Sequence, residues 1–215
     1  MTLSPKDAST RAFEICSLAP IVPVLVVEDA ATARPLAEAL VAGGLPALEV
    51  TLRTPAALDV IREMAQVAGG VVGAGTVLTR ADVVAAKEAG AQFAVSPGAT
   101  EALIAACCEE GLPLLPGAAT SSEVMRLLEH GFDMMKFFPA EASGGAPALK
   151  AIGAPLAAAR FCPTGGVSPK NAMDYLSLSN VVCAGGSWVA PGDKVRAGDW
   201  AGIETLARDA AKLGS

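Results

Sequence analysis

Short apolar runs alternate along the chain with longer segments rich in Ala and Leu. The runs start at residues 21, 46, 71, 92, 113, 133, 159 and 181. Successive starts are separated by 20 to 26 residues, enough for one strand, one helix and two short loops. The pattern therefore predicts eight βα units, whose strands must run parallel.

The segments between the runs carry helix signals. RADVVAAKEAG from residue 80 and SSEVMRLLEHG from residue 121 end in Gly, as helices commonly do. KDASTRAFEICSLA, from residue 6, predicts an extra helix before the first strand. We therefore expect an α/β fold, a single-domain (β/α)8 TIM barrel over residues 1–215 with an extra N-terminal helix. An open doubly wound sheet is the alternative, which eight units of similar length disfavour.

The composition fits a globular chain that binds small molecules. Of 215 residues, 52% are hydrophobic and 18% charged, with a net charge of -6. This balance gives no general attraction for nucleic acid or an anionic membrane. No apolar window reaches the length of about 18 residues that a membrane span needs. The first twenty residues lack the features of a secretory signal, so we expect a cytoplasmic protein.

Cysteine and histidine offer little metal-binding chemistry. The five cysteines lack CxxC spacing and are interpreted as reduced core thiols. His130 is the only histidine and is placed near a helix end. Without HxH, CxxC or DxD spacing, we expect no metal and no other cofactor.

The second apolar run separates its side chains by parity. One face carries Leu48, Val50 and Leu52, and the other carries Glu49, Thr51 and Arg53. In a barrel whose strands are covered by helices, the polar row would line the mouth, where catalytic groups lie. A structural ion pair is the alternative.

Lys136 stands among bulky apolar residues in DMMKFFP, from residue 133. If Met135 and Phe137 meet the helices, Lys136 faces the barrel interior. An amine in a dry pocket is disfavoured as an ammonium, and a neutral amine can condense with a ketone to form a Schiff base. Glu49 could then relay protons and Arg53 could bind a carboxylate. A lysine that reaches solvent or pairs with a carboxylate is the alternative.

Two glycine-rich segments close the seventh and eighth strands. PTGGVS, residues 163 to 168, and AGGSW, residues 184 to 188, lie where barrels often bind phosphate through backbone N–H groups. Two tight turns would explain the same residues. GAGT, residues 73 to 76, and SPG, residues 96 to 98, are expected to make room for a ligand at the third and fourth strands, and packing beside larger barrel side chains is the alternative.

Taken together, these motifs closely resemble the class I aldolases that cleave 2-keto-3-deoxy-6-phosphogluconate (KDPG), in the KDPG/KHG aldolase family. The similar segments are PIVPVLVV (20–27), EVTLRT (49–54), GAGTVL (73–78), SPG (96–98), KFFPAE (136–141), PTGGVSP (163–169) and GGSW (185–188). The resemblance implies that Lys136 is the Schiff-base lysine and Glu49 the general acid/base. It also implies a homotrimer, a small-molecule substrate and an aldehyde-lyase activity of the Entner-Doudoroff pathway.

The resemblance assigns the remaining site residues as well. Arg53 would bind the substrate carboxylate, and Thr76, Pro97 and Phe138 would shape the pyruvyl pocket. The residues expected to contact the rest of the substrate and its phosphate are Thr164, Gly165, Gly166, Gly185, Gly186 and Ser187. Ala118, Ala119 and Ser143 depart from the family pattern, which leaves substrate preference open. Cleavage of 2-keto-3-deoxy-6-phosphogalactonate or 4-hydroxy-2-oxoglutarate is one alternative, and a noncatalytic barrel that senses sugar-acid phosphates is another.

Overall fold

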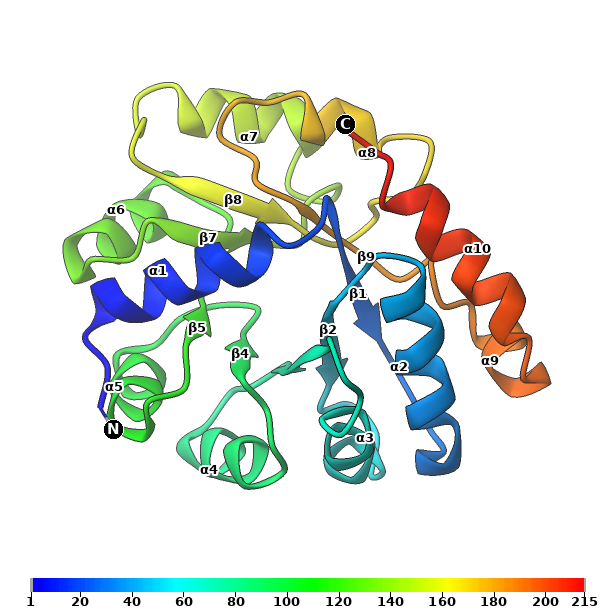
Figure 1. The fold of residues 1–215 in the computed structure, drawn as a ribbon. Coiled ribbons are helices and arrows are strands. Elements are labelled where there is room, and N and C mark those ends of the chain that lie inside the picture. The colour runs from blue at the N-terminus through cyan, green and yellow to red at the C-terminus, as the bar shows by residue number, and fades with distance from the viewer. Residues whose placement is uncertain (1, 215) are drawn as a thin grey trace.

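The computed structural model describes residues 2–214, so Met1 and Ser215 of the expected domain lie outside the described residues. Helices and strands alternate along the chain (Figure 1). The strands are β1 (Ile21–Leu25), β2 (Ala47–Thr51), β3 (Val71–Gly75), β4 (Phe93–Val95), β5 (Leu114–Leu115), β6 (Gly117–Ala118), β7 (Met134–Phe137), β8 (Arg160–Pro163) and β9 (Ala184–Gly186). The helices are α1 (Pro5–Cys16), η1 (Ala30–Thr32), α2 (Ala33–Ala42), α3 (Ala57–Met64), α4 (Arg80–Glu88), α5 (Glu101–Glu110), α6 (Ser121–His130), α7 (Gly145–Gly153), α8 (Ala172–Leu176), α9 (Gly192–Ala197) and α10 (Trp200–Ala210).

The strands pair in parallel, which confirms the α/β class expected from the sequence. One group has the order β5-β4-β3-β2-β1-β9 and the other β6-β7-β8. Every predicted run contains a strand, and the run from residue 113 contains both β5 and β6. Pro116 separates these two, since proline has no N–H to continue the ladder. Two isolated parallel bridges, Phe161 to Val181 and Thr164 to Gly185, link β8 and the residue after it to the segment that forms β9.

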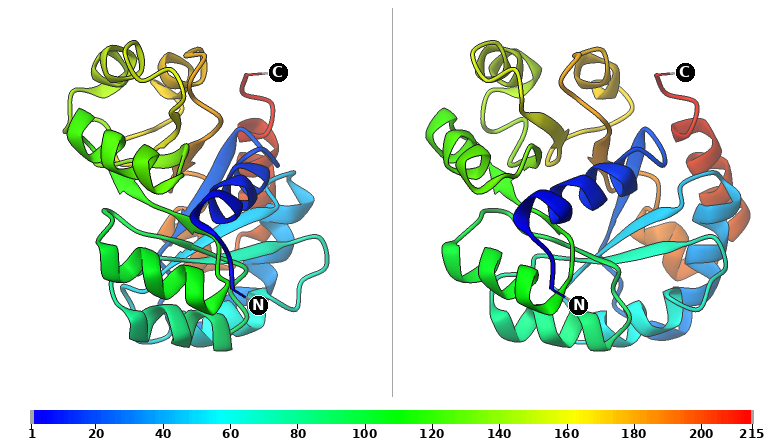
Figure 2. Two further views of the ribbon diagram at one scale, coloured as in Figure 1. Left: turned by 90° about the vertical axis from the view of Figure 1, so that its left-hand side faces the viewer. Right: turned by 60° about the vertical axis from the view of Figure 1, so that its left-hand side comes forward.

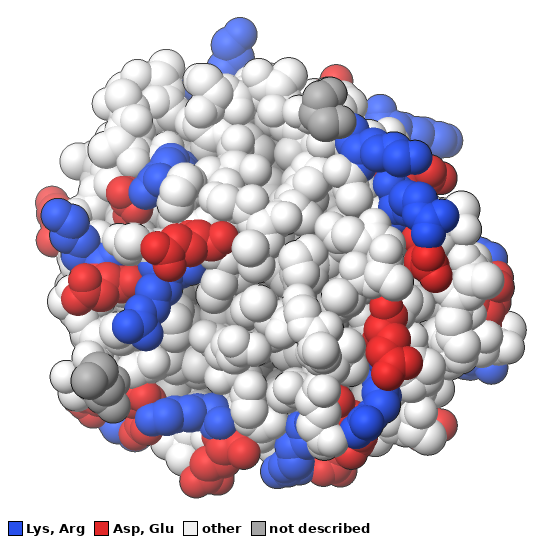
Figure 3. All heavy atoms as spheres, in the orientation of Figure 1, with Lys and Arg blue, Asp and Glu red and all other residues white. Residues whose placement is uncertain are grey.

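Helices form a layer outside the curled sheet, as the views in Figure 2 also show. Strand side chains of one parity, such as Leu48, Val50 and Phe137, pack in the core with the helices. Those of the other parity, such as Met134 and Phe93, pack in a second core. On the face shown in Figure 3, charged side chains gather toward the periphery and the centre carries few. Within residues 2–214, each helix is too short or too polar to cross a bilayer.

Local sequence explains where the helices after the strands begin and end. Thr120 and Glu123 form a reciprocal capping box at the start of α6, and Gly131 ends the helix in a left-handed conformation with φ 96°. Thr79 and Asp82 form the same box at α4. The two caps come four and two residues after the ends of β3 and β6, so they help to set the direction in which the chain leaves the sheet.

Helix α1 is attached to the start of β7, the strand that carries Lys136. Ser9 Oγ donates to Asp133 Oδ1 at 2.8 Å and accepts from the Met134 N–H at 3.0 Å. Arg160, paired with Asp133 at 2.8 Å, also stacks 3.8 Å above the ring of Phe13. These contacts hold β7 at its N-terminal end and leave its C-terminal end for the candidate site.

Candidate active site

The side chains of Lys136 and Glu49 meet inside the sheet. Lys136 Nζ lies 3.1 Å from Glu49 Oε1, and the two residues are only 6% and 3% exposed. The prediction that Lys136 points toward the interior that Glu49 faces is therefore confirmed. The alternative interpretation of Lys136, a lysine paired with a carboxylate, also holds. Its partner is Glu49, so the inward-facing lysine and the ion-paired lysine are the same feature.

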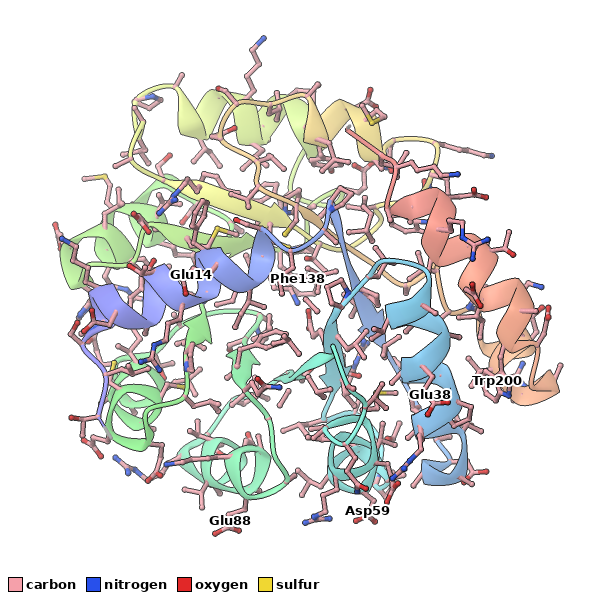
Figure 4. The ribbon with its side chains drawn as sticks, in the orientation of Figure 1. Glu14, Glu38, Asp59, Glu88, Phe138 and Trp200 are labelled. Atoms are coloured by element: carbon pink, nitrogen blue, oxygen red, sulfur yellow. The ribbon has the colours of Figure 1, made fainter. Side chains whose placement is uncertain are left out.

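The Lys136–Glu49 pair is almost completely buried, and this burial determines how its two charges behave. Two charges taken out of water lose much of their solvation, and removing either partner leaves the other uncompensated. The phenyl ring of Phe138, 5.4 Å from Lys136 Nζ, helps to keep the amine dry while remaining favourable to its positive form. Figure 4 shows Phe138 near the centre of the molecule, whereas Asp59 and Glu88 lie at its periphery.

A cavity of about 510 Å³ opens above the pair. Its lining residues are Val24, Val26, Glu49, Thr51, Arg53, Thr76, Pro97, Lys136, Phe138, Thr164, Gly165, Gly166, Val167, Gly185 and Ser187. The cavity thus brings together eleven of the twelve residues predicted for the site. The guanidinium of Arg53 is exposed at the mouth and forms no hydrogen bond or ion pair within the described chain, so it is available to an anion.

Gly186 is the predicted site residue that does not line the cavity. Alternation along β9 places Gly185 and Ser187 toward the cavity and Gly186 on the other side. A Cβ on Gly186 would lie 2.0 Å from the ring of Trp188, so the glycine makes room for that ring. Its lack of a side chain therefore serves packing.

Gly75 at the end of β3 makes room for Glu49. A Cβ there would lie 2.3 Å from Glu49 Oε1, far inside ordinary contact. The sequence had suggested that the small residues of GAGT leave space for a ligand. At Gly75 the space is filled instead by the carboxylate that reaches Lys136.

Thr76, the next residue, has a backbone conformation that is costly for a β-branched side chain. Its φ is 60°, the one positive value for a non-glycine residue among residues 2–214. Residues held in such conformations cluster at functional sites, where the surrounding structure maintains them. Thr76 is one of the residues that line the cavity.

The two glycine-rich segments meet at one side of the cavity. Gly165 and Gly166 have φ of 101° and 81°, which glycine tolerates best. The N–H groups of Gly166, Val167 and Ser187 have no hydrogen-bond partner within residues 2–214. Unpaired N–H groups lining a cavity are suited to an anion. Val24, Val26 and Val167 were not singled out in the sequence, since isolated valines carry no chemical signal.

Three buried thiols lie in contact below the cavity, on α1, β8 and the residue before β9. Hydrogen bonds from Cys16 and then Cys183 hold the pKa of the Cys162 thiol well below its usual range, and the charge of Lys136 acts in the same direction. The pKa of Cys183 is raised by the thiols of Cys16 and Cys162 and by burial. The structure describes no group of three His, Cys, Asp or Glu side chains arranged to hold a metal ion between residues 2 and 214.

The family model for KDPG and KHG aldolases matches residues 13–206. The chain belongs to the KDPG and KHG aldolase family. A family member from Pseudoalteromonas atlantica, named 2-dehydro-3-deoxy-phosphogluconate aldolase, is 54% identical, covering 95% of this chain and 96% of its own length. The KHG/KDPG aldolase of Escherichia coli K12 is 51% identical over 96% of this chain and 98% of its own length.

Solved structures of this aldolase family have the same fold. The Zymomonas mobilis ZM4 aldolase, solved with 3-phosphoglycerate, has a TM-score of 0.90 and 50% identity, covering 94% of this chain and 96% of that one. The Legionella pneumophila aldolase, in which pyruvate was captured as a covalent carbinolamine, has a TM-score of 0.90 and 42% identity over 93% of this chain and 98% of that one.

Proposed function

We propose that this aldolase-family protein cleaves KDPG to pyruvate and glyceraldehyde 3-phosphate through a Schiff base on Lys136. The observation that carries the proposal is a buried amine 3.1 Å from a buried carboxylate, beneath a cavity with an available arginine at its mouth. Relatives at about half identity across nearly the whole chain are named for cleavage of this substrate. The captured carbinolamine of the Legionella protein is the first intermediate that such chemistry requires.

The proposed reaction starts with attack of Lys136 Nζ on the C2 ketone and loss of water to give an iminium ion. Glu49 accepts the C4 hydroxyl proton, directly or through a water molecule, as the C3–C4 electrons move into the iminium. Glyceraldehyde 3-phosphate leaves and an enamine remains. Glu49 returns its proton, directly or through a water molecule, to C3 of the enamine, and water hydrolyses the resulting imine to release pyruvate and the free amine.

The remaining cavity residues would bind and orient the substrate. Arg53, which lines the cavity, would form a bidentate pair with the C1 carboxylate. Thr76, Pro97, Phe138 and Thr164 would enclose the pyruvyl part of the substrate. The distal phosphate would bind near the ends of β8 and β9, at Gly165, Gly166, Gly185 and Ser187. Contacts far from the broken bond position the substrate, and the imine lowers the barrier.

A second candidate substrate is 4-hydroxy-2-oxoglutarate, because the E. coli relative is named for both KHG and KDPG. The same lysine, glutamate and arginine would serve this reaction. The ratio of kcat/KM for the two substrates decides between them, and a clear preference for 4-hydroxy-2-oxoglutarate, or for 2-keto-3-deoxy-6-phosphogalactonate, would replace KDPG as the main substrate.

We also infer that the two groups of strands make one closed (β/α)8 barrel in a single domain. The chain continues from β5 through Pro116 into β6, and parallel bridges connect β8 and Thr164 with the β9 segment. Helix α1 would be the extra helix at one end. We further propose a cytoplasmic homotrimer, in keeping with five free thiols and the family resemblance.

The first test is borohydride reduction in the presence of pyruvate, followed by mass spectrometry of peptides. We expect a stable pyruvate adduct on Lys136 and no adduct in Lys136→Ala. Glu49→Gln should still form the adduct while turnover of KDPG falls at least about 100-fold. Absence of the adduct in the wild-type protein would reject the Schiff base and favour the noncatalytic sugar-acid phosphate sensor.

A further inference from the structure

Three consecutive carbonyl groups of the loop after β8 turn away from the cavity. The carbonyl of Thr164 accepts from the Ala140 N–H at 2.8 Å, and that of Gly165 accepts from the Glu141 N–H at 3.0 Å. The third, on Gly166, accepts from the Asn171 side chain, Nδ2, at 3.1 Å. The first two donors belong to the backbone, and the third is a side chain that substitution can remove.

The direction of these carbonyls determines where the loop's N–H groups point. In a planar trans peptide the C=O of one residue and the N–H of the next point in opposite directions. Holding the Gly165 carbonyl away from the cavity turns the Gly166 N–H toward it, and Asn171 does the same for the Val167 N–H. Both residues line the cavity, and both N–H groups are unpaired among residues 2–214.

Asn171 uses both ends of its amide on this loop. Its Oδ1 accepts from the Ser168 N–H at 2.7 Å and from Ser168 Oγ at 3.1 Å, while Nδ2 holds Gly166. Asn171 is also the residue that precedes α8, where an asparagine usually caps the helix. Here its side chain makes no capping hydrogen bond to α8. The side chain is therefore committed to the shape of the loop.

Little adjustment of the loop is possible from its other side. Glu141 packs against Gly166, where an added Cβ would lie 2.5 Å from Glu141 Cγ. The Tyr175 hydroxyl, in turn, donates a hydrogen bond to the Glu141 carboxylate. Gly166 is thus fixed between Glu141 and Asn171, and loss of the Asn171 contact frees the peptide that carries the Val167 N–H.

We propose that Asn171 is a positioning residue that aims the Val167 N–H at the substrate's phosphate and so favours phosphorylated over unphosphorylated oxo acids. The inference rests on the proposed function, since it concerns the distal end of the same substrate. Asn171 touches neither the reacting carbon atoms nor the Lys136 to Glu49 pair. Its effect should therefore be confined to the phosphate.

Two variants separate the two ends of the Asn171 amide. Asn171→Asp keeps an acceptor for Ser168 but loses the donor to the Gly166 carbonyl, and Asn171→Ala loses both. For each variant we expect KM for KDPG to rise about tenfold, the effect of losing one hydrogen bond to a charged group. Competitive inhibition by inorganic phosphate should weaken by the same factor. The pyruvate concentration that half-saturates borohydride trapping at Lys136 should stay within about twofold of the wild-type value.

The controls distinguish hydrogen bonding from charge and from general damage. Asn180→Asp makes the same chemical change at an asparagine whose side chain has no hydrogen bond to the loop, and it should leave all three quantities unchanged. At about 1 M salt, where the Debye length is about 3 Å, repulsion by the new carboxylate is screened but a lost hydrogen bond is not. For the neutral Asn171→Ala, the loss of phosphate affinity relative to the wild-type protein should be the same at every salt concentration.

The outcomes are distinct. An unchanged KM for KDPG, or an equal loss in pyruvate trapping and in KDPG affinity, overturns the role of Asn171 and leaves the aldolase mechanism intact. Failure of the wild-type protein to form any pyruvate adduct instead overturns the proposed function itself. A phosphate-selective loss in both variants supports the positioning role.

Discussion

Gly75→Ala probes the requirement for a fixed Glu49 without replacing either residue of the Lys136–Glu49 pair. The added methyl would lie 2.3, 2.7 and 2.9 Å from Oε1, Cγ and Cδ of Glu49, whereas ordinary contacts begin at 3.4 Å. The carboxylate must therefore retreat by about 1 Å, from a position where Oε1 lies 3.1 Å from Lys136 Nζ. A misplacement of this size costs about 100-fold in rate, or about 2.7 kcal/mol of transition-state stabilisation.

Stability should respond differently from activity. Gly75 does not have a positive φ, so alanine fits its backbone and reduces the conformational entropy of the unfolded chain. Overpacking against Glu49 costs about 1–3 kcal/mol, so we expect the melting temperature to fall by about 2–12 °C while the protein stays folded. Gly98→Ala is the matched control, because a Cβ at Gly98 would meet nothing within 4 Å. It should retain nearly full activity.

The assay is steady-state cleavage of KDPG, with pyruvate detected by a coupled dehydrogenase, alongside thermal melting and borohydride trapping. The expected result for Gly75→Ala is a kcat/KM about 100-fold below that of Gly98→Ala, with a folded protein that still traps pyruvate. Wild-type kcat/KM in a well-folded Gly75→Ala protein would refute the reasoning, because Glu49 would then act equally well from a displaced position.

The remaining predictions concern binding and helix capping. Arg53→Ala should lower kcat/KM about 30-fold for phosphorylated and unphosphorylated oxo acids alike. Ser187→Ala should lower kcat/KM about fivefold for KDPG alone. If both variants lowered kcat/KM for the two classes of substrate in the same ratio, Arg53 and Ser187 would not bind separate ends of the substrate. The Ala119 N–H, by donating to the Glu123 carboxylate, lowers the pKa of Glu123. Because folding lowers this pKa, ionised Glu123 stabilises the fold at pH values above the pKa of the unfolded chain. This stabilisation is lost as the pH falls through the folded-state pKa. Urea unfolding should therefore show Glu123→Gln about 0.5 kcal/mol less stable at pH 7, with the difference shrinking below about pH 4.3.

The parity of β2 and β7 made the centre of the site predictable. Glu49 and Lys136 each occupy the polar position between apolar residues that pack toward the helices, and both strands keep the two-residue alternation that extended backbone imposes. The expected strand positions were confirmed for the same reason. The break at Pro116 within the fifth run was not foreseen, although proline's missing N–H explains it.

The contacts of Asn171 could not be predicted from the sequence. Its neighbours give no chemical signal, and its contacts depend on the direction of the Gly166 carbonyl, which follows from backbone angles on both sides. Gly186 is the one predicted site residue that does not line the cavity, because strand alternation turns it toward Trp188. Adjacent glycines look equivalent in a sequence, and only their register in the strand separates them.

The sequence by itself determined the order of βα units, the polar row of Glu49 and Arg53, and the direction of a lysine set among apolar residues. These features depend on local periodicity, which every strand and helix expresses alone. Tertiary structure decided that Lys136 and Glu49 approach to 3.1 Å, that Gly75 makes room for that approach, and that Asn171 orients a loop five residues away. Those distances depend on how separate strands are placed side by side, which no local pattern contains.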